Sequence, residues 1–502
     1  MYSESMKIIL NINYYLSMKL KEIKINLIDI IIKHLKQDYL CKCQSLHIIF
    51  EKLKFITFIL INVITMMYYI RLQIYNDKVK SNYLNIKNNL NLTFIHELEN
   101  KIKVGIYSYT IKNGGRARVT VLLLNYLNTI NLFQIYLFTV KMRQDNEYIY
   151  PKTIRRIITK NNNLIKLIKK NKIDVFIYQL DNINEINYLN KKQDIKVLFY
   201  IHSSTLDWIY ANYTKFKKIY KEYLNSRYLI SLVPFENDYI FRKWGLRSIL
   251  MDNFITFDYN SVIPSDLSSK IILMLGRAND KKKRFKLGIL SMEYIIPEIP
   301  QCHLIIISNL TGISNQKDLI YNLNLENNIK FIGYSSTPEF FFINASLNAF
   351  PSISESFGLV LSETKLYGIP NILLGLDYVS ISEGGTEIIY DDSPESLSQI
   401  MIRILKNNKY KRKLGKKARK SMKKFNNTLL LYKWVKLILS IYNGNEYYEE
   451  LRESYQRMSE YDAINILNNQ INLLNMRKRF IEYINLAFYK NFTLISNLTQ
   501  IN

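Results

Sequence analysis

Cysteine is scarce in this chain of 502 residues, with only Cys41, Cys43 and Cys302 present. Three cysteines cannot build the disulfide framework that small secreted domains rely on. Cys41 and Cys43 form a lone C-x-C without further cysteine or histidine at the spacing of zinc ligands, which argues against a zinc site. No repeat recurs at a fixed period.

Acidic residues are also few, 42 against 69 lysines and arginines, which gives a formal net charge of +27. No motif for RNA or DNA binding accompanies this charge. We interpret the lysines as a scattered, solvated surface in a chain rich in Asn, Ile and Tyr, and expect no nucleic-acid partner. The hydrophobic content of 48% is too high for a disordered chain, and the length suits two or three domains.

The N-terminal region, residues 1–100, contains one uncharged run at 55–70, between Lys54 and Arg71. As a helix this run would measure about 24 Å, less than the roughly 30 Å of a bilayer core. It lies too far from the first residue to be a cleaved signal sequence. Two interpretations stay open, a membrane anchor and a helix buried against the next domain. The first predicts a membrane-associated protein and the second a cytoplasmic one.

From residue 101 onward, short apolar runs alternate with longer amphipathic stretches. This alternation is typical of a parallel sheet covered by helices on both faces, so we predict an α/β fold. A glycine loop followed by an amphipathic helix lies at 113–130. The strands expected in this first domain, residues 101–255, are 101–109, 132–140, 173–178, 197–202 and 228–233.

The alternation then restarts and predicts a second α/β domain at residues 256–425, joined to the first by a linker at 251–270. After about Asp392 the pattern is helical, and residues 426–502 are expected to form C-terminal helices and an extension. The strand segments expected in the second domain are 271–280 with its polar turn, 302–308, 329–333, 347–352 and 371–375.

The segment S-E-S-F-G-L-V-L-S-E at 354–363 is the most specific in the chain. Glycine inside a helix costs roughly 1 kcal/mol relative to alanine. We therefore predict a loop that carries Glu355 and a helix that begins near Gly358 and carries Glu363 in its second turn. Free backbone N–H groups at a helix start favour an anion. Carboxylates beside that anion suit a ligand rich in hydroxyls, such as a nucleotide sugar.

Other candidate residues lie at the carboxyl ends of expected strands, where open parallel sheets bind ligands. Gly114 and Gly115 would let a ligand approach the backbone, although an ordinary tight turn has the same pattern. His202 ends a strand and is either a ligand contact or a structural hydrogen-bonding group. Arg277 and the lysines after it form either a cationic site for a diphosphate or a solvated loop.

These segments, in this order, resemble the glycosyltransferase family 4 group, also called glycosyl transferases group 1. S-E-S-F-G-L-V-L-S-E resembles the E-x7-E segment of the family, and L-G-R-A-N-D-K-K-K-R-F resembles its donor-phosphate loop. N-G-G-R-A-R-V resembles the N-terminal glycine loop, and Y-I-H-S-S-T-L-D-W-I-Y resembles the segment with a histidine at a strand end. The resemblance covers roughly residues 101–443, leaves both ends unexplained, and implies the GT-B fold, with two Rossmann-like domains facing a cleft. At both ends we expect helical extensions.

The resemblance also implies roles for individual residues. Arg277 and one lysine, Lys283 or else Lys282, would neutralise the departing diphosphate, together with the N–H groups around Phe357, Gly358 and Leu359. Glu355 would accept hydrogen bonds from the donor sugar and Glu363 from the ribose. His202 would contact the sugar and the reacting face. Gly114 and Gly115 would let the first domain close on the donor.

The function that follows is a retaining glycosyltransferase of the hexosyltransferase type. It would move a sugar from a nucleotide diphosphate to a hydroxyl of a glycan, lipid-linked or protein acceptor, with no metal or other cofactor. One departure concerns the first domain, where Ala117 stands at a position that is usually acidic in the family. This departure motivates the alternative, a non-catalytic GT-B-like scaffold or sugar-nucleotide-binding protein.

Overall fold

The computed structural model describes residues 100–489, apart from residues 113, 145–146, 160–162, 193, 205–216, 278–279, 334, 336–337, 445 and 455–458. The chain divides into two compact units, Met1–Leu84 and Asn85–Asn502. All described residues belong to the second unit. The predicted N-terminal helical region and its uncharged run at 55–70 lie outside the described residues and stay predictions.

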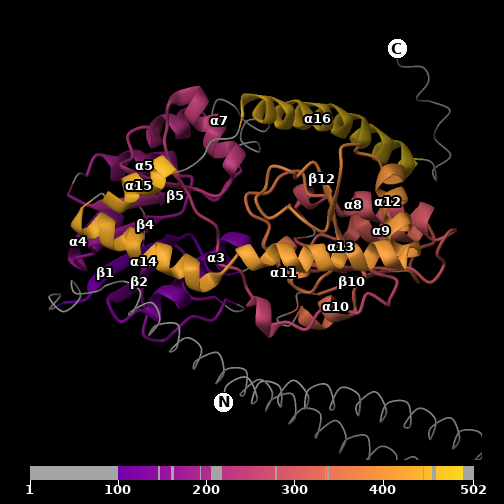
Figure 1. The fold of residues 1–502 in the computed structure, drawn as a ribbon, viewed down its shortest axis with the longest axis horizontal. Coiled ribbons are helices and arrows are strands. Elements are labelled where there is room, and N and C mark those ends of the chain that lie inside the picture. Colours follow the sequence, from indigo (N-terminus) through magenta and orange to yellow (C-terminus); the bar gives the residue numbers. More distant parts are fainter. Residues whose placement is uncertain are drawn as a thin grey trace, which may run out of the picture. The chain divides into compact units, whose positions relative to one another are not determined.

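The first sheet contains seven parallel strands in the order β3-β2-β1-β4-β5-β6-β7. Strands β1, β2, β4 and β5 of this sheet are labelled in Figure 1. Each of its inner strands is an almost continuous buried apolar run, as parallel strands covered on both faces require. The strands are β1 (Ile102–Ser108), β2 (Phe133–Thr139), β3 (Arg155–Ile158), β4 (Val175–Tyr178), β5 (Lys196–Tyr200), β6 (Tyr228–Ser231) and β7 (Ile249–Leu250). The helices are α3 (Gly115–Asn128), α4 (Leu164–Lys170), α5 (Ile183–Asn190) and α7 (Pro234–Trp244).

The second sheet has six parallel strands in the order β10-β9-β8-β11-β12-β13. Both sheets thus share the 3-2-1-4-5-6 order of a Rossmann fold, which confirms the predicted pair of α/β domains. The strands are β8 (Ile271–Leu275), β9 (His303–Ile307), β10 (Ile329–Ile332), β11 (Leu347–Phe350), β12 (Asn371–Leu374) and β13 (Thr386–Ile389). The helices are α8 (Phe285–Ile295), α9 (Ser314–Asn322), α10 (Glu339–Asn344) and α11 (Leu359–Leu366), with the short 3-10 turns η2 (Tyr259–Ser261) and η3 (Lys281–Lys283).

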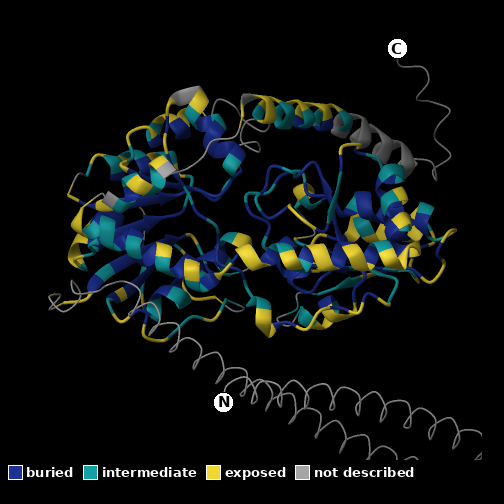
Figure 2. Cartoon of the chain, in the orientation of Figure 1, coloured by how far each residue is buried: buried dark blue, intermediate teal, exposed yellow. Residues whose placement is uncertain are grey.

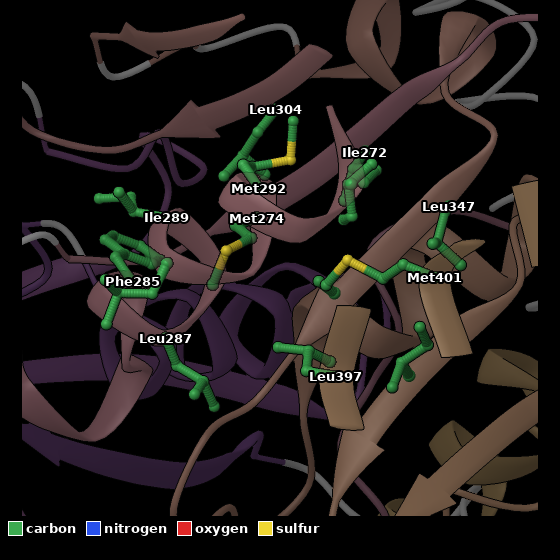
Figure 3. Packing of buried hydrophobic residues seen from close by; sticks show 14 of the residues in the cluster. Ile272, Met274, Phe285, Leu287, Ile289, Met292, Leu304, Leu347, Leu397 and Met401 are labelled. Atoms are coloured by element: carbon green, nitrogen blue, oxygen red, sulfur yellow. The ribbon is translucent and has the colours of Figure 1, made fainter. Parts of the chain in front are cut away.

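The core of the second domain lies where α8 and α12 (Pro394–Lys406) pack together over β8 (Figure 3). Met274 on β8 and Leu287 on α8 are fully buried there. Gly288 permits the close approach of helix and strand, because a Cβ atom at this position would lie 2.3 Å from the Met274 sulfur. This core fixes the start of α8, and with it the loop that precedes α8.

The C-terminal helices contact both domains. Helix α14 (Asn427–Asn443) contacts α3 and β4, and α15 (Glu446–Ser454) contacts β7. Helix α16 (Glu460–Tyr489) contacts α7 of the first domain, and its Leu473 is fully buried in the core of the second. A Cβ atom at Gly375, just after β12, would lie 2.0 Å from Leu473 Cδ1. The region expected to be an extension therefore packs tightly on the domains.

Helix α13 (Asn408–Ser421), followed by η4 (Met422–Lys424), carries the densest positive charge in the second half of the chain. Its sequence N-K-Y-K-R-K-L-G-K-K-A-R-K-S contains no acidic residue. Exposed residues recur along this helix in Figure 2, and the exposed cations are Lys409, Arg412, Lys413, Lys416, Lys417 and Lys420. The charge is thus less evenly scattered than the sequence led us to expect.

Candidate active site

The loop after β8 carries the predicted cationic residues. Asp280 accepts hydrogen bonds from the Arg277 side chain (2.8 Å) and from the Lys282 backbone N–H (3.1 Å). A Cβ atom at Gly276 would lie 2.9 Å from Lys283 Cγ, so glycine leaves the room in which the Lys283 side chain lies. The Arg277 side chain remains 65% exposed. The loop therefore presents an accessible guanidinium and a partly buried lysine, Lys283, whose side chain is 21% exposed.

Lys283 and Glu355, 72 residues apart in the chain, form an ion pair. The Lys283 ammonium also lies over the ring of Phe350, 5.3 Å from its centroid. The loop is tied to the glutamate segment by the Ile353 N–H, which donates to the Lys282 carbonyl at 2.9 Å. Of the two lysines that the sequence left open, Lys283 is the one that contacts Glu355, whereas Lys282 is exposed.

Helix α11 begins as the sequence predicts. Gly358 is its N-cap, with φ of 82° in the left-handed region that favours glycine, and no side chain caps the first turn. Phe357 is buried and packs edge-on against Phe425, with centroids 5.8 Å apart. The first N–H groups of α11, near Leu359, are thus available to an anion close to Glu355.

Glu363 lies in the second turn of α11 and is only 1% exposed. It forms an ion pair with Arg118 of α3, and Thr256 donates a hydrogen bond to it at 2.6 Å. Burial raises the pKa of Glu363, while Arg118 and then Thr256 oppose this shift. Glu363, the residue predicted to bind the ribose, is therefore already paired with a residue of the first domain. The sequence did not indicate this pairing.

The first domain contributes the glycine loop before α3. Gly114 has φ of 100°, in the region that favours glycine, and a Cβ atom at Gly114 or Gly115 would meet nothing within 4 Å. The backbone at the start of α3 is therefore open to a ligand, as the sequence predicts. The preceding residue, 113, lies outside the described part of the chain.

His202 follows β5 and is buried, with its Nε2 atom 2.8 Å from Gln179 Oε1. Burial holds the pKa of His202 well below its usual value, and the charge of Arg116 lowers it further. The imidazole is therefore neutral at pH 7 and can act through hydrogen bonds. Both readings of His202, ligand contact and structural group, are compatible with this position.

Arg116 belongs to a small network that sequence reasoning missed. Its guanidinium contacts Asp181 at 2.9 Å and the Ser203 hydroxyl at 3.0 Å. Ser203 in turn donates to Asp181. The run R-A-R-V was noted only as a departure from the family, yet Arg116 and Arg118 both make ion pairs. Neither partner could be found from sequence spacing, because Asp181 and Glu363 lie far along the chain.

The residues thus form two groups. Lys283 and Glu355 meet beside the start of α11, within the second domain, whereas Arg118 and Glu363 meet across the two domains.

Within the described ranges, no group of three or more His, Cys, Asp and Glu side chains could hold a metal ion. In the part of the chain that is described, no helix is long and apolar enough to cross a membrane.

Comparison with known proteins defines the class to which this arrangement belongs. Residues 258–421 match the family described as glycosyl transferases group 1, which confirms the predicted resemblance for the second domain. The sucrose-phosphate synthase of Thermosynechococcus elongatus has a similar structure, with a TM-score of 0.55 and 17% identity over 71% of this chain and 100% of that one. HepE of Anabaena, solved with UDP and glucose, has a TM-score of 0.54 and 15% identity over 68% and 99%. The fold is GT-B.

One curated relative matches a part of the chain. The poly(glycerol-phosphate) alpha-glucosyltransferase of Bacillus subtilis (strain 168) is 24% identical over 151 residues, which are 29% of this chain. The match spans 22% of the length of that relative, about a fifth. The second domain is thus similar to the glycosyl transferases group 1 family, and the chain has a GT-B fold.

Proposed function

We propose that the protein is a retaining glycosyltransferase that moves a hexose from a nucleotide diphosphate to an acceptor hydroxyl. The observation that carries this proposal is the Lys283–Glu355 pair beside the uncapped start of α11. A cation and free N–H groups stabilise the diphosphate as negative charge develops on it. A carboxylate next to them is suited to accept hydrogen bonds from the hydroxyls of the sugar.

In this proposal each predicted residue acts at the donor. Lys283 and the exposed Arg277 neutralise the diphosphate, with the α11 N–H groups around Phe357, Gly358 and Leu359 beside them. Glu355 orients the sugar, Glu363 binds the ribose and His202 contacts the reacting face from the first domain. Gly114 and Gly115 allow the first domain to approach the donor. Lys282 stays an exposed secondary contact for phosphate.

Protein cations replace a metal ion in this proposal. A divalent ion at a transferring phosphoryl group supplies fixed positive charge, which Lys283 and Arg277 supply here. Transfer is therefore expected to continue in excess EDTA. The similar HepE structures contain UDP-glucose and UDP, so UDP-hexoses are the first donors to test.

The acceptor is proposed to be a glycan or a lipid-linked molecule. The name of the Bacillus subtilis relative adds poly(glycerol phosphate) to the acceptors worth testing. Membrane association remains a proposal that depends on residues 55–70. If this run is an anchor, the full chain will stay in the pellet when membranes are washed with alkaline carbonate.

The test is a transfer assay with the full chain and a panel of radiolabelled UDP-, GDP-, ADP- and dTDP-hexoses in EDTA. Acceptors are offered as mixed glycans, glycolipids and poly(glycerol phosphate). Release of nucleotide diphosphate, or labelled product, from one donor supports the proposal, and its loss in Glu355→Gln ties it to the site. Folded protein that releases nothing from any donor contradicts catalysis.

The alternative is a non-catalytic GT-B scaffold, and the departure at Ala117 with the Arg116–Asp181 pair favours it. This pair lies at the carboxyl ends of the strands of the first domain, where His202 also lies. A scaffold of this kind binds a nucleotide diphosphate yet leaves the sugar bond intact. Calorimetric binding without turnover on the same samples identifies it.

A further inference from the structure

The ion pair between Arg118 and Glu363 joins the two domains at one buried point. Arg118 lies in the first turn of α3, on the first sheet, and Glu363 lies in α11, on the second. Thr256, in the segment between β7 and β8, donates to the same carboxylate. Three parts of the chain thus converge on one side chain that is almost completely enclosed.

A buried carboxylate without a counter-charge is costly, and it responds by taking up a proton. The charged groups around Glu363 are Arg118 on α3 and Glu339 on α10, and Glu339 opposes ionisation. On the helices packed against α11, Arg419 of α13 donates to the carbonyl of Leu366 at the far end, and Lys424 of η4 pairs with Glu383. Arg118 is therefore the one cation among these groups that pairs with the Glu363 carboxylate and favours its ionised form.

The same contacts fix how the carboxylate is held. Arg118 and Thr256 both contact its Oε1 atom. A ribose diol donates hydrogen bonds, and an ionised carboxylate accepts them better than a protonated one. A carboxylate that Arg118 and Thr256 hold in one orientation is thus suited, when ionised, to accept hydrogen bonds from a diol.

We propose that Arg118 is a positioning residue for the nucleotide: from the opposite domain it keeps Glu363 ionised and oriented toward the ribose diol. Tight binding of the nucleotide then requires both domains in contact, so binding is coupled to the approach of α3 to α11. This inference rests on the ribose role of Glu363 in the proposed function. It assigns Arg118, a residue of the first domain, to binding of the nucleotide donor.

The test is the dissociation constant of UDP, measured by calorimetry from pH 5.5 to pH 8.5 on the full chain. Arg118→Met removes the cation, so the pKa of Glu363 rises and binding weakens by up to about tenfold at pH 6, no more than in Glu363→Ala. The loss shrinks as pH rises, because each pH unit below the pKa reduces the ionised fraction up to tenfold. Arg118→Lys, which keeps the charge, should restore most of the affinity.

Three controls separate this role from a structural one. In a Glu363→Gln background, Arg118→Met should add little further loss, because no carboxylate remains to be ionised. UDP lacking the 2′ and 3′ hydroxyls should bind the wild type and Arg118→Met almost equally. Arg403→Met, which breaks an exposed pair with Glu387, should leave the UDP affinity within twofold. If Arg118→Met does not fold, Arg118→Gln takes its place.

The outcomes distinguish this inference from the proposed function. If the wild type binds no nucleoside diphosphate among UDP, GDP, ADP and dTDP, both the proposed function and this inference fail. If it binds one of them and Arg118→Met shows the same affinity and pH profile, only this inference fails. Tighter binding by Arg118→Met would also overturn it, since the pair would then compete with the ribose.

Discussion

The two glutamates of the E-x7-E segment differ in how they are held. Glu355 pairs with Lys283 from the same domain and remains partly accessible. Glu363 pairs with Arg118 from the other domain and is almost fully buried. The pair at Glu355 is thus assembled within one domain, whereas the pair at Glu363 requires two. A change at the first should alter chemistry, and a change at the second should alter binding.

The largest effect is expected at Glu355 and Lys283. Glu355→Gln and Lys283→Met should each lower kcat about 100-fold or more, because both groups act on charge that develops during transfer. The folded structure should persist, since neither side chain is fully buried. Steady-state kinetics with the active donor, together with circular dichroism, measure both quantities.

A matched control for this pair is Glu298→Gln. Glu298 forms a pair with Lys406 on the surface, away from the site, so kcat should stay within twofold. Wild-type turnover by Lys283→Met would contradict the assignment of the phosphate site. Arg277→Ala should lower kcat as Lys283→Met does. An unchanged kcat in Arg277→Ala would limit the phosphate site to Lys283.

The next effect concerns the contact of α16 with the second domain. Leu473→Ala should lower the free energy of unfolding by about 2 to 5 kcal/mol, because its side chain is fully buried against Gly375. Ile471→Ala, two residues earlier and 43% exposed, should cost less than about 1 kcal/mol. Urea unfolding compares the two. Equal effects would show that α16 does not belong to the core of the second domain.

Glu363→Ala is expected to weaken nucleotide binding about tenfold with a smaller change in kcat. The ribose contact is made equally in the ground state and the transition state, so it contributes to affinity rather than to the chemical step. Calorimetry with UDP and steady-state kinetics give the two values. A loss of kcat without a loss of UDP affinity would contradict the binding role assigned to Glu363.

The smallest effect concerns Lys365, two residues beyond Glu363. Its buried ammonium donates to the carbonyls of Ile381 and Glu383, and burial lowers its pKa to about 7. Between pH 7 and the usual lysine range the unfolded chain binds the proton and the folded chain does not, so stability rises with pH. The wild type should gain about 1 kcal/mol more than Lys365→Met between pH 7 and pH 8 in urea unfolding. Parallel curves for the two proteins would contradict this.

The sequence predicted the two sheets because their inner strands are buried apolar runs. It missed β3, β7 and β13, which are edge strands in the sheet orders and are short or only half-buried. The start of α11 was predictable, since Gly358 is a poor interior residue and a good cap. These features are local in the chain, which is why the pattern reveals them.

Contacts between distant segments could not be predicted. Arg118 looked like part of an irregular glycine loop, and only the folded chain shows that it meets Glu363. The same holds for Leu473. Helix α16 carries several apolar residues, and the sequence does not indicate which of them enters the core. In both cases the partner is set by how two domains and a C-terminal helix pack, which no short stretch encodes.

The central claim, sugar transfer at the Lys283–Glu355 site, is tested most directly by proton NMR of a single reaction. The full chain is incubated in EDTA with the nucleotide hexose that binds best and its acceptor, and the anomeric signals are followed in time. We predict that the donor signal decays and a glycoside with the same anomeric configuration appears, and that Lys283→Met abolishes both. A product of inverted configuration would contradict the retaining mechanism, and an unchanged donor signal in the wild type would contradict catalysis.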